Sequence, residues 1–182
     1  MTLLARLADA IDRVNDRAGR GVAWLLIAMV LVQFTVVILR YVFAIGSAAA
    51  QEAIWAMHGV VFLIGAGYTL LRDGHVRVDV FYREASARFR AIVDLAGAVL
   101  FLVPVCAVIL WLSLPYAARS WAVLEGSTEA GGLPLVFAYK TVICVFAILL
   151  GLQGVSMAIR SSLRLAGRDD KARGGTIVRP GL

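Results

Sequence analysis

Four long stretches without an acidic or basic side chain limit most strongly how this chain can fold. They cover residues 21–39, 53–71, 95–118 and 141–159, and each is 19 to 24 residues long. An α-helix rises about 1.5 Å per residue and the hydrocarbon core of a bilayer is about 30 Å thick, so each stretch is long enough to cross it. Only 16% of the chain is charged, against about 25% in an average soluble domain. The sequence therefore predicts an all-α integral membrane protein with four transmembrane helices.

The basic residues are concentrated on one side of the predicted membrane domain. Fifteen of the 18 lysines and arginines precede the first span, separate the second from the third, or follow the fourth. Because cytoplasmic loops carry the excess of lysine and arginine, we expect both termini to be cytoplasmic. The basic surplus thus reflects topology, and no alternation of aromatic and basic residues indicates nucleic-acid binding. The three exceptions are Arg40, Arg119 and Lys140.

Three regions are predicted along the chain. In residues 1–20 apolar side chains recur every three or four positions opposite a charged face, which is typical of an amphipathic helix lying in the headgroup layer or against a partner. Residues 21–163 form the four-helix membrane domain. Residues 164–182 are basic and lack an apolar period, so we expect a disordered cytoplasmic tail. The predicted spans are about 21–43, 52–71, 92–118 and 134–160.

Two prolines fall within the third predicted span, and one cysteine falls within each of the third and fourth. Pro104 and Pro115 predict local kinks in the third span, because proline has no N–H to donate within a helix. Cys106 and Cys144 lie at different depths when counted from the cytoplasmic ends of their helices, so a disulfide is not expected. We interpret them as buried, inert thiols.

Within the charge-free stretches, His58 is the best candidate for chemistry. A haem-binding four-helix protein would need axial ligands in pairs, and the other histidine, His75, lies in the loop between the second and third spans. Gln33 falls at a similar depth to His58, and we expect a structural hydrogen bond between them. No nucleophile with a base and an orienting acid is present, so the sequence predicts neither an enzyme active site nor a cofactor.

The segment LRDGHVRVDVFY, residues 71–82, is the most charged part of the centre of the chain. Asp73, His75 and Asp79 could share a cation, but Arg72 and Arg77 would repel it, so no metal site is predicted. A single glycine does not make a phosphate-binding loop. We interpret the segment as the cytoplasmic turn between spans two and three, whose arginines maintain orientation and are available to lipid phosphates or a partner.

The first extracytoplasmic connection has a charge at each end. Arg40 closes the first span and Glu52 opens the second. Helices joined by so short a connection are antiparallel neighbours, so the sequence predicts an ion pair between these residues that fixes the hairpin. Two separately solvated charges are the alternative.

Three segments of the chain resemble one family of membrane proteins. They are FTVVILRYVF, QEAIWAMHGVVFLIGAGYTLLRDGHVRVDVFY and EGSTEAGGLPLVFAYK, within residues 20–163. In this order and spacing they resemble the DctQ-like small membrane subunit of tripartite ATP-independent periplasmic (TRAP) transporters. Family tryptophans often precede the glutamate, whereas here Ala50 and Gln51 do and Trp55 follows. The positions that match the family pattern are Arg40, Glu52, Gly65, Gly74, His75, Arg77, Val78 and Asp79.

The resemblance implies a scaffold in the bacterial inner membrane. The expected partners are a large multi-span permease, which binds solute and sodium and moves like an elevator, and a periplasmic binding protein that delivers an organic acid such as a dicarboxylate or 2-oxo acid. The alternatives are a self-sufficient small exporter, which would need an acidic residue inside a helix, and a haem-binding electron-transfer subunit. The candidate interface or structural residues are Gln33, Arg40, Glu52, Trp55, His58, Arg72, Gly74, His75, Arg77 and Asp79.

Overall fold

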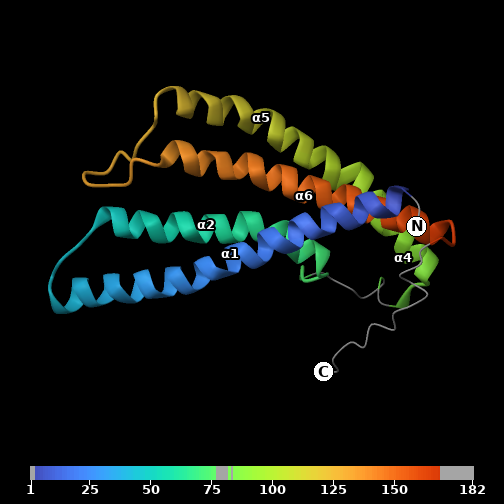
Figure 1. Cartoon of the computed structure of the whole chain (residues 1–182), viewed down its shortest axis with the longest axis horizontal. Helices are drawn as coiled ribbons and strands as arrows, with labels where there is room; N and C mark the ends of the chain where they lie inside the picture. Colours follow the sequence, from blue (N-terminus) through green and yellow to red (C-terminus); the bar gives the residue numbers. More distant parts are fainter. Residues whose placement is uncertain (1–2, 77–81, 83, 169–182) are drawn as a thin grey trace.

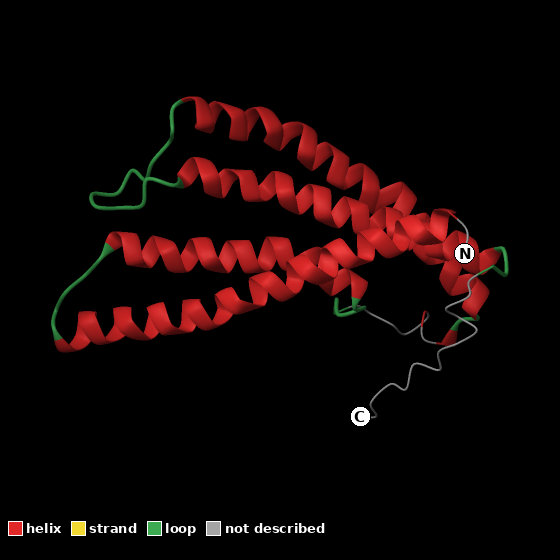
Figure 2. Cartoon of the chain, in the orientation of Figure 1, coloured by secondary structure: helices red, strands yellow, loops and turns green. Residues whose placement is uncertain are grey.

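The structure is a computed structural model that describes residues 3–76, 82 and 84–168. Within these residues it is helical and contains no strand (Figure 2). Four helical segments of this described part are long and apolar enough to cross a membrane, which confirms the predicted fold class. They are α1 (Leu3–Val42), α2 (Ala48–Leu71), the continuous segment Ala87–Ala122, and α6 (Val136–Leu165). The third consists of α4 (Ala87–Gly97), the π-helical turn η1 (Ala98–Leu102) and α5 (Val103–Ala122).

The helices form two antiparallel hairpins, α1 with α2 and α5 with α6 (Figure 1). Helix α6 also packs against α1, α2 and α4, so it lies at the centre of the bundle. We call the end that carries connections 43–47 and 123–135 the loop end. The opposite end, where α1 begins and α6 finishes, is the terminal end. In Figure 1 the hairpins cross near the terminal end and lie apart at the loop end.

Helix α1 includes both the predicted amphipathic segment and the first span. It runs for 40 residues without a break at residue 20, since no proline or capping residue interrupts it there. Its buried residues recur every three or four positions and lie in the amphipathic half, against other helices of this chain. Part of the apolar face remains exposed, at Leu3, Leu4, Leu7 and Val14. The buried residues are Ala8, Ile11, Asn15 and Gly19.

The third span departs from α-helical geometry immediately before Pro104. In η1 the Val103 N–H donates to the Ala98 carbonyl, five residues back, instead of four. This wider turn accommodates the proline, whose ring would otherwise press on the carbonyl of Leu100 and which offers that carbonyl no N–H. The helix continues through Pro115, whose carbonyl accepts a hydrogen bond of 3.2 Å from Arg119 Nε.

The spans differ in how much of their apolar surface is buried. In the most apolar window of α6 33% of the residues are buried, against 6% in α1. Small residues allow this packing, because Gly154 lies directly against the Leu102 side chain, and Gly151 against Cys106. Cys106 and Cys144 are both free and buried. Large apolar side chains on the outer helices stay exposed, including Trp24, Phe34 and Trp111.

Candidate functional site: polar clusters at the two ends of the bundle

Glu52 connects α2 to the long loop that follows α5. It is the fifth residue of α2, whose N-cap is Ser47. One carboxylate oxygen accepts a hydrogen bond from the Ser127 hydroxyl, and the other accepts one of 2.7 Å from the Leu133 backbone N–H. Position 132 has no room for a side chain, since a Cβ there would overlap Ser127. The Gly-Gly sequence therefore allows the loop to close over Glu52.

A second carboxylate connects the same loop to α5 and α6. Glu125 Oε2 accepts hydrogen bonds from Lys140 Nζ at 2.5 Å and from Ser120 Oγ at 2.6 Å. The hydrogen bond from Lys140, followed by the one from Ser120, lowers the pKa of the Glu125 carboxyl below its usual value. Lys140 Nζ also lies 4.2 Å from the centre of the Tyr116 ring, a cation–π contact. We call Glu52, Ser120, Glu125, Ser127 and Lys140 the loop-end cluster.

The predicted ion pair between Arg40 and Glu52 is wrong. Both residues lie in the described part of the chain, and no ion pair joins them there. Arg40 is exposed near the end of α1. Both oxygens of Glu52 are already occupied by Ser127 and Leu133, on a loop far along the sequence. Adjacency within a hairpin therefore did not identify the partner of this carboxylate.

A polar network crosses the interface between α1 and α6 near the terminal end. Asp12 Oδ1 accepts hydrogen bonds from Ser156 Oγ at 2.6 Å and from Gln153 Nε2 at 3.1 Å. Asp12 Oδ2 accepts one of 3.0 Å from Arg160 Nε, and the Asp12 and Arg160 side chains are only 16% and 19% exposed. We call Asp12, Asn15, Gln153, Ser156 and Arg160 the junction network.

Asn15 extends this network to a third helix. Its side chain is fully buried, and Nδ2 donates to Gln153 Oε1 at 2.9 Å and to the Leu149 carbonyl at 3.2 Å. Its Oδ1 has no hydrogen-bond partner among the described residues and lies where a Cβ of Gly67 would be. The missing side chain at Gly67 thus lets α2 approach Asn15, in an arrangement suited to a weak Cα–H···O contact.

Arg72 joins α1 to α2 at the terminal end. It lies at the C-cap of α2, where Nη2 is 2.5 Å from Asp16 Oδ1 and the guanidinium lies 5.3 Å from the centre of the Tyr68 ring. The Gly74 N–H then donates to the Thr69 carbonyl at 2.9 Å and closes the end of the helix.

The other candidates in the segment 71–82 are His75, Arg77 and Asp79. His75 is exposed. Arg77 and Asp79 lie outside the described residues. Within the residues that the structure describes, no group of three or more His, Cys, Asp or Glu side chains could hold a metal ion.

The remaining candidates lie on the outside of the bundle. Trp55 is 65% exposed, and Gln33 and His58 are exposed on α1 and α2. The His58 ring stacks on Phe62, with ring centres 6.5 Å apart. The expected hydrogen bond between Gln33 and His58 is wrong, since none joins these two described residues. Residue counting gives the depth of a side chain in the membrane but not the rotation of its helix.

Sequence reasoning missed the partners of the junction network, although a signal was present. Gln153, Ser156 and Arg160 recur at three- and four-residue spacing and form a polar stripe on an otherwise apolar helix. Asp12 and Asn15 have the same spacing on α1. A polar stripe on an apolar helix indicates an interface with polar groups of another helix, and the charged face of residues 1–20 offers such groups.

Comparison with known proteins connects this architecture to a transport system. The family model described as "Tripartite ATP-independent periplasmic transporters, DctQ component" matches residues 29–164. The chain is also 34% identical over 82 residues to the "C4-dicarboxylate TRAP transporter small permease protein DctQ" of Vibrio cholerae serotype O1. That similarity covers 42% of this chain and only 33% of the length of the relative. No solved structure matches the chain.

Proposed function

This chain belongs to the DctQ family of TRAP transporter components, and from that premise we propose that it is a small permease subunit that scaffolds a larger, sodium-coupled transport subunit. The transported solute in this proposal is an organic acid of the dicarboxylate or 2-oxo acid type. A relative is named for C4-dicarboxylates, which supports that class. Selection of the individual solute is assigned to the large subunit and the binding protein.

The observation that carries this proposal is the contrast between the interior of the bundle and its outer faces. Near the terminal end Arg160 of α6 is paired with Asp9 and Asp12 of α1. No aspartate, glutamate, lysine or arginine occurs in residues 21–39, 53–71, 95–118 or 141–159. The outer helices expose large apolar side chains such as Trp24 and Trp111. Such a molecule has wide surfaces for lipid and a partner, but no ionised group at mid-depth to hold a cargo.

The distribution of charge supports an orientation for the proposed subunit. In the sequence, 15 of the 18 basic residues precede the first span, separate the second from the third or follow the fourth, so we assign the terminal end to the cytoplasm of an inner-membrane protein. The loop end, with its cluster around Glu52 and Glu125, then faces the periplasm. In this orientation the loop 123–135 is a surface on which a binding protein could dock.

Reconstitution tests the scaffold function. We expect liposomes that contain this chain alone to take up no solute under a sodium gradient, even with a binding protein present. Liposomes that also contain the large subunit should take up the organic acid, and those with the large subunit alone should take up less. Uptake by the lone chain would contradict the proposal, as would full activity of the large subunit without it.

A further inference from the structure

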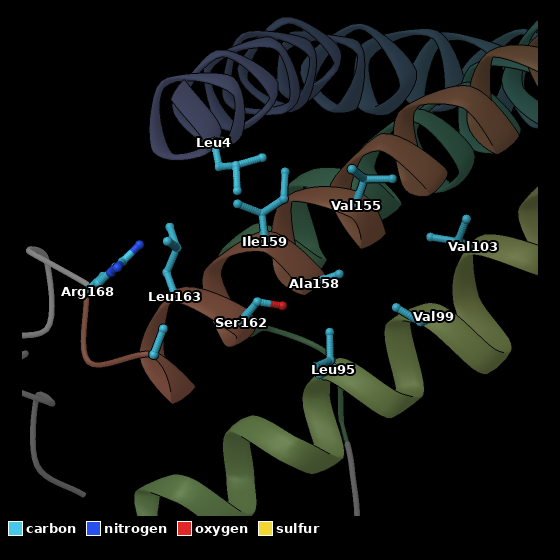
Figure 3. A pocket seen from close by; sticks show the side chains of 11 residues that line it. Leu4, Leu95, Val99, Val103, Val155, Ala158, Ile159, Ser162, Leu163 and Arg168 are labelled. Carbon is cyan, nitrogen blue, oxygen red and sulfur yellow. The ribbon is translucent and has the colours of Figure 1, made fainter. Parts of the chain in front are cut away.

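An apolar groove lies at the terminal end between the third span, α6 and the start of α1 (Figure 3). It has a volume of about 550 Å³, within the range of roughly 300–1,000 Å³ that is usual for small-molecule sites. One wall is formed by residues such as Leu95 and Val99, and the other by Val155 and Ile159 of α6. Leu4 of α1 completes the lining.

The end of α6 places a cation at this groove. Gly167 has a φ of +67°, a left-handed conformation that glycine adopts without strain. Its N–H donates to the Arg164 carbonyl at 3.1 Å, and the Arg168 N–H donates to the Leu163 carbonyl at 2.9 Å. These two bonds form a Schellman turn, which reverses the chain and sets Arg168 beside Leu163. Both residues line the groove.

The groove is about as long as one leaflet of a bilayer is thick, and it is apolar with a cation at one end. Its lining on α6 extends from Val155 to Ala166, which is roughly 16 Å at 1.5 Å per residue, or about one leaflet of a 30 Å hydrocarbon core. The lining is apolar except for the Ser162 hydroxyl, which points into the groove in Figure 3, and Arg168 at its outer end. None of the described residues that line it is acidic.

We propose that this groove binds one acyl chain of an anionic phospholipid, whose phosphate pairs with Arg168. An amphiphile with an apolar chain and an anionic head matches a groove that is apolar along its length and cationic at its mouth. Basic pockets between transmembrane helices are known to take the head groups of anionic lipids. This site is a property of the chain itself and does not depend on the proposed transport function.

The test compares two lipids on the full chain. The protein is purified in detergent, stripped of lipid, and mixed with phosphatidylglycerol or phosphatidylcholine that carry the same acyl chains. Retained lipid is counted by native mass spectrometry, and the shift of the unfolding temperature is measured in parallel. We expect several-fold tighter binding of phosphatidylglycerol, because only its net negative charge is complementary to Arg168.

Five variants separate the head-group contact from the groove. Arg168→Ala should weaken phosphatidylglycerol binding about fivefold, toward the level of phosphatidylcholine, and Arg168→Lys should retain most of the preference. Arg119→Ala removes a charge at the loop end and should change nothing. Val99→Trp fills the groove and should abolish retention of both lipids, whereas Val108→Trp, exposed on the same span but outside the groove, should not.

Several results would overturn the proposal. Equal binding of the two lipids by the native chain would show that the lipids bind elsewhere. So would equal lipid binding by Arg168→Ala and Arg168→Lys, or by Val99→Trp and Val108→Trp. If a chain that ends at Arg168 bound lipid and the full chain did not, the groove would be a binding site for residues 169–182 and not for lipid. If lipid bound to the chain alone but was absent from the complex with its large subunit, the groove would be a binding site for that partner.

Discussion

The two polar clusters of this molecule hold helices together in different ways. The junction network joins α1 to α6 and α2 through side chains that lie within helices and are largely buried. The loop-end cluster joins α2 to α5 and α6 through a loop, because Glu52 bonds to Ser127 and Leu133. In Figure 1 the two hairpins cross near the first cluster and lie apart at the second.

This difference shows which end of the bundle is held in place by contacts within the chain. Near the terminal end, buried polar groups require partners on particular helices, so that the crossing of α1 over α6 is fixed. Toward the loop end, the outer helices expose apolar surface, and α1 has only 6% of its most apolar window buried. We infer that the loop end relies on its surroundings, whether lipid or protein, more than the terminal end does.

The largest expected effect is the loss of one partner of the Asp12–Arg160 pair. Asp12→Ala removes the carboxylate that accepts hydrogen bonds from Arg160, Gln153 and Ser156, and leaves the largely buried Arg160 guanidinium with Asp9 as its remaining ion-pair partner. We expect the free energy of unfolding to fall by about 2–3 kcal/mol, as for other buried pairs with one member removed. Reversible unfolding in detergent measures the loss.

Two further variants check this prediction. Arg13→Ala, at the exposed position next to Asp12, should have little effect, because among the described residues that side chain donates a hydrogen bond to the backbone carbonyl of Asp9 and to no side chain. The double variant Asp12→Ala/Arg160→Ala should lose less than the sum of the single losses. Additive losses would mean that the pair is not coupled.

The next effect concerns the close approach of α1 to α2. In Gly67→Ala the new Cβ would overlap Asn15 Oδ1 and lie 3.4 Å from the Leu149 carbonyl. We expect about 1–2 kcal/mol of destabilisation, as for overpacking in other cores, measured by thermal unfolding. Gly65→Ala is the matched control two residues away, where a Cβ meets no described atom within 4 Å. Equal stability of the two variants would contradict the close packing of Asn15 against Gly67.

A smaller, local effect is expected at Glu52. Glu52→Ala removes the acceptor of the Leu133 N–H and of the Ser127 hydroxyl. The Leu133 amide should then exchange its hydrogen several-fold faster, while amides in the junction network keep their rates. Retention of the large subunit in a pull-down should weaken as well. Gln51→Ala is the control, and unchanged exchange and unchanged retention in Glu52→Ala would remove Glu52 from the site.

The smallest effect is a pH dependence at the loop end. The folded chain holds the pKa of Glu125 below its usual value, so the ionised carboxylate stabilises the fold above the usual pKa of glutamate. This contribution is lost as the pH falls through the lowered pKa. The unfolding temperature should therefore fall on acidification, and the Glu125→Gln variant should lack that part of the decline. Glu129→Gln, on the exposed side of the loop, should behave like the native chain.

Hydropathy was sufficient to predict four membrane-spanning helices but not where each helix ends. The helix that contains the span expected at 92–118 covers Ala87–Ala122, and the helix that corresponds to the span expected at 134–160 covers Val136–Leu165. Charged residues mark where a chain leaves the hydrocarbon, but arginine and alanine favour helix and do not end it. For the same reason α1 passes through residue 20 without a break.

The contacts of the site could be predicted only in part. Glu52 and Arg72 were candidates from the sequence, and both make contacts between elements in the structure, but the sequence did not identify Ser127 or Asp16 as their partners. These pairings depend on how each helix is rotated and on how a long loop folds back. Neither property has a local signal in a single sequence.

The unbroken course of α1 has a mechanical consequence. Forty residues of helix measure roughly 60 Å, twice the thickness of the hydrocarbon core. The first span and the stretch before it are therefore one continuous helix, and the contacts of Asn15 with Gln153 and Gly67 position both of them at once. A displacement of the start of the chain would be transmitted toward Arg40 with no loop between them to absorb it.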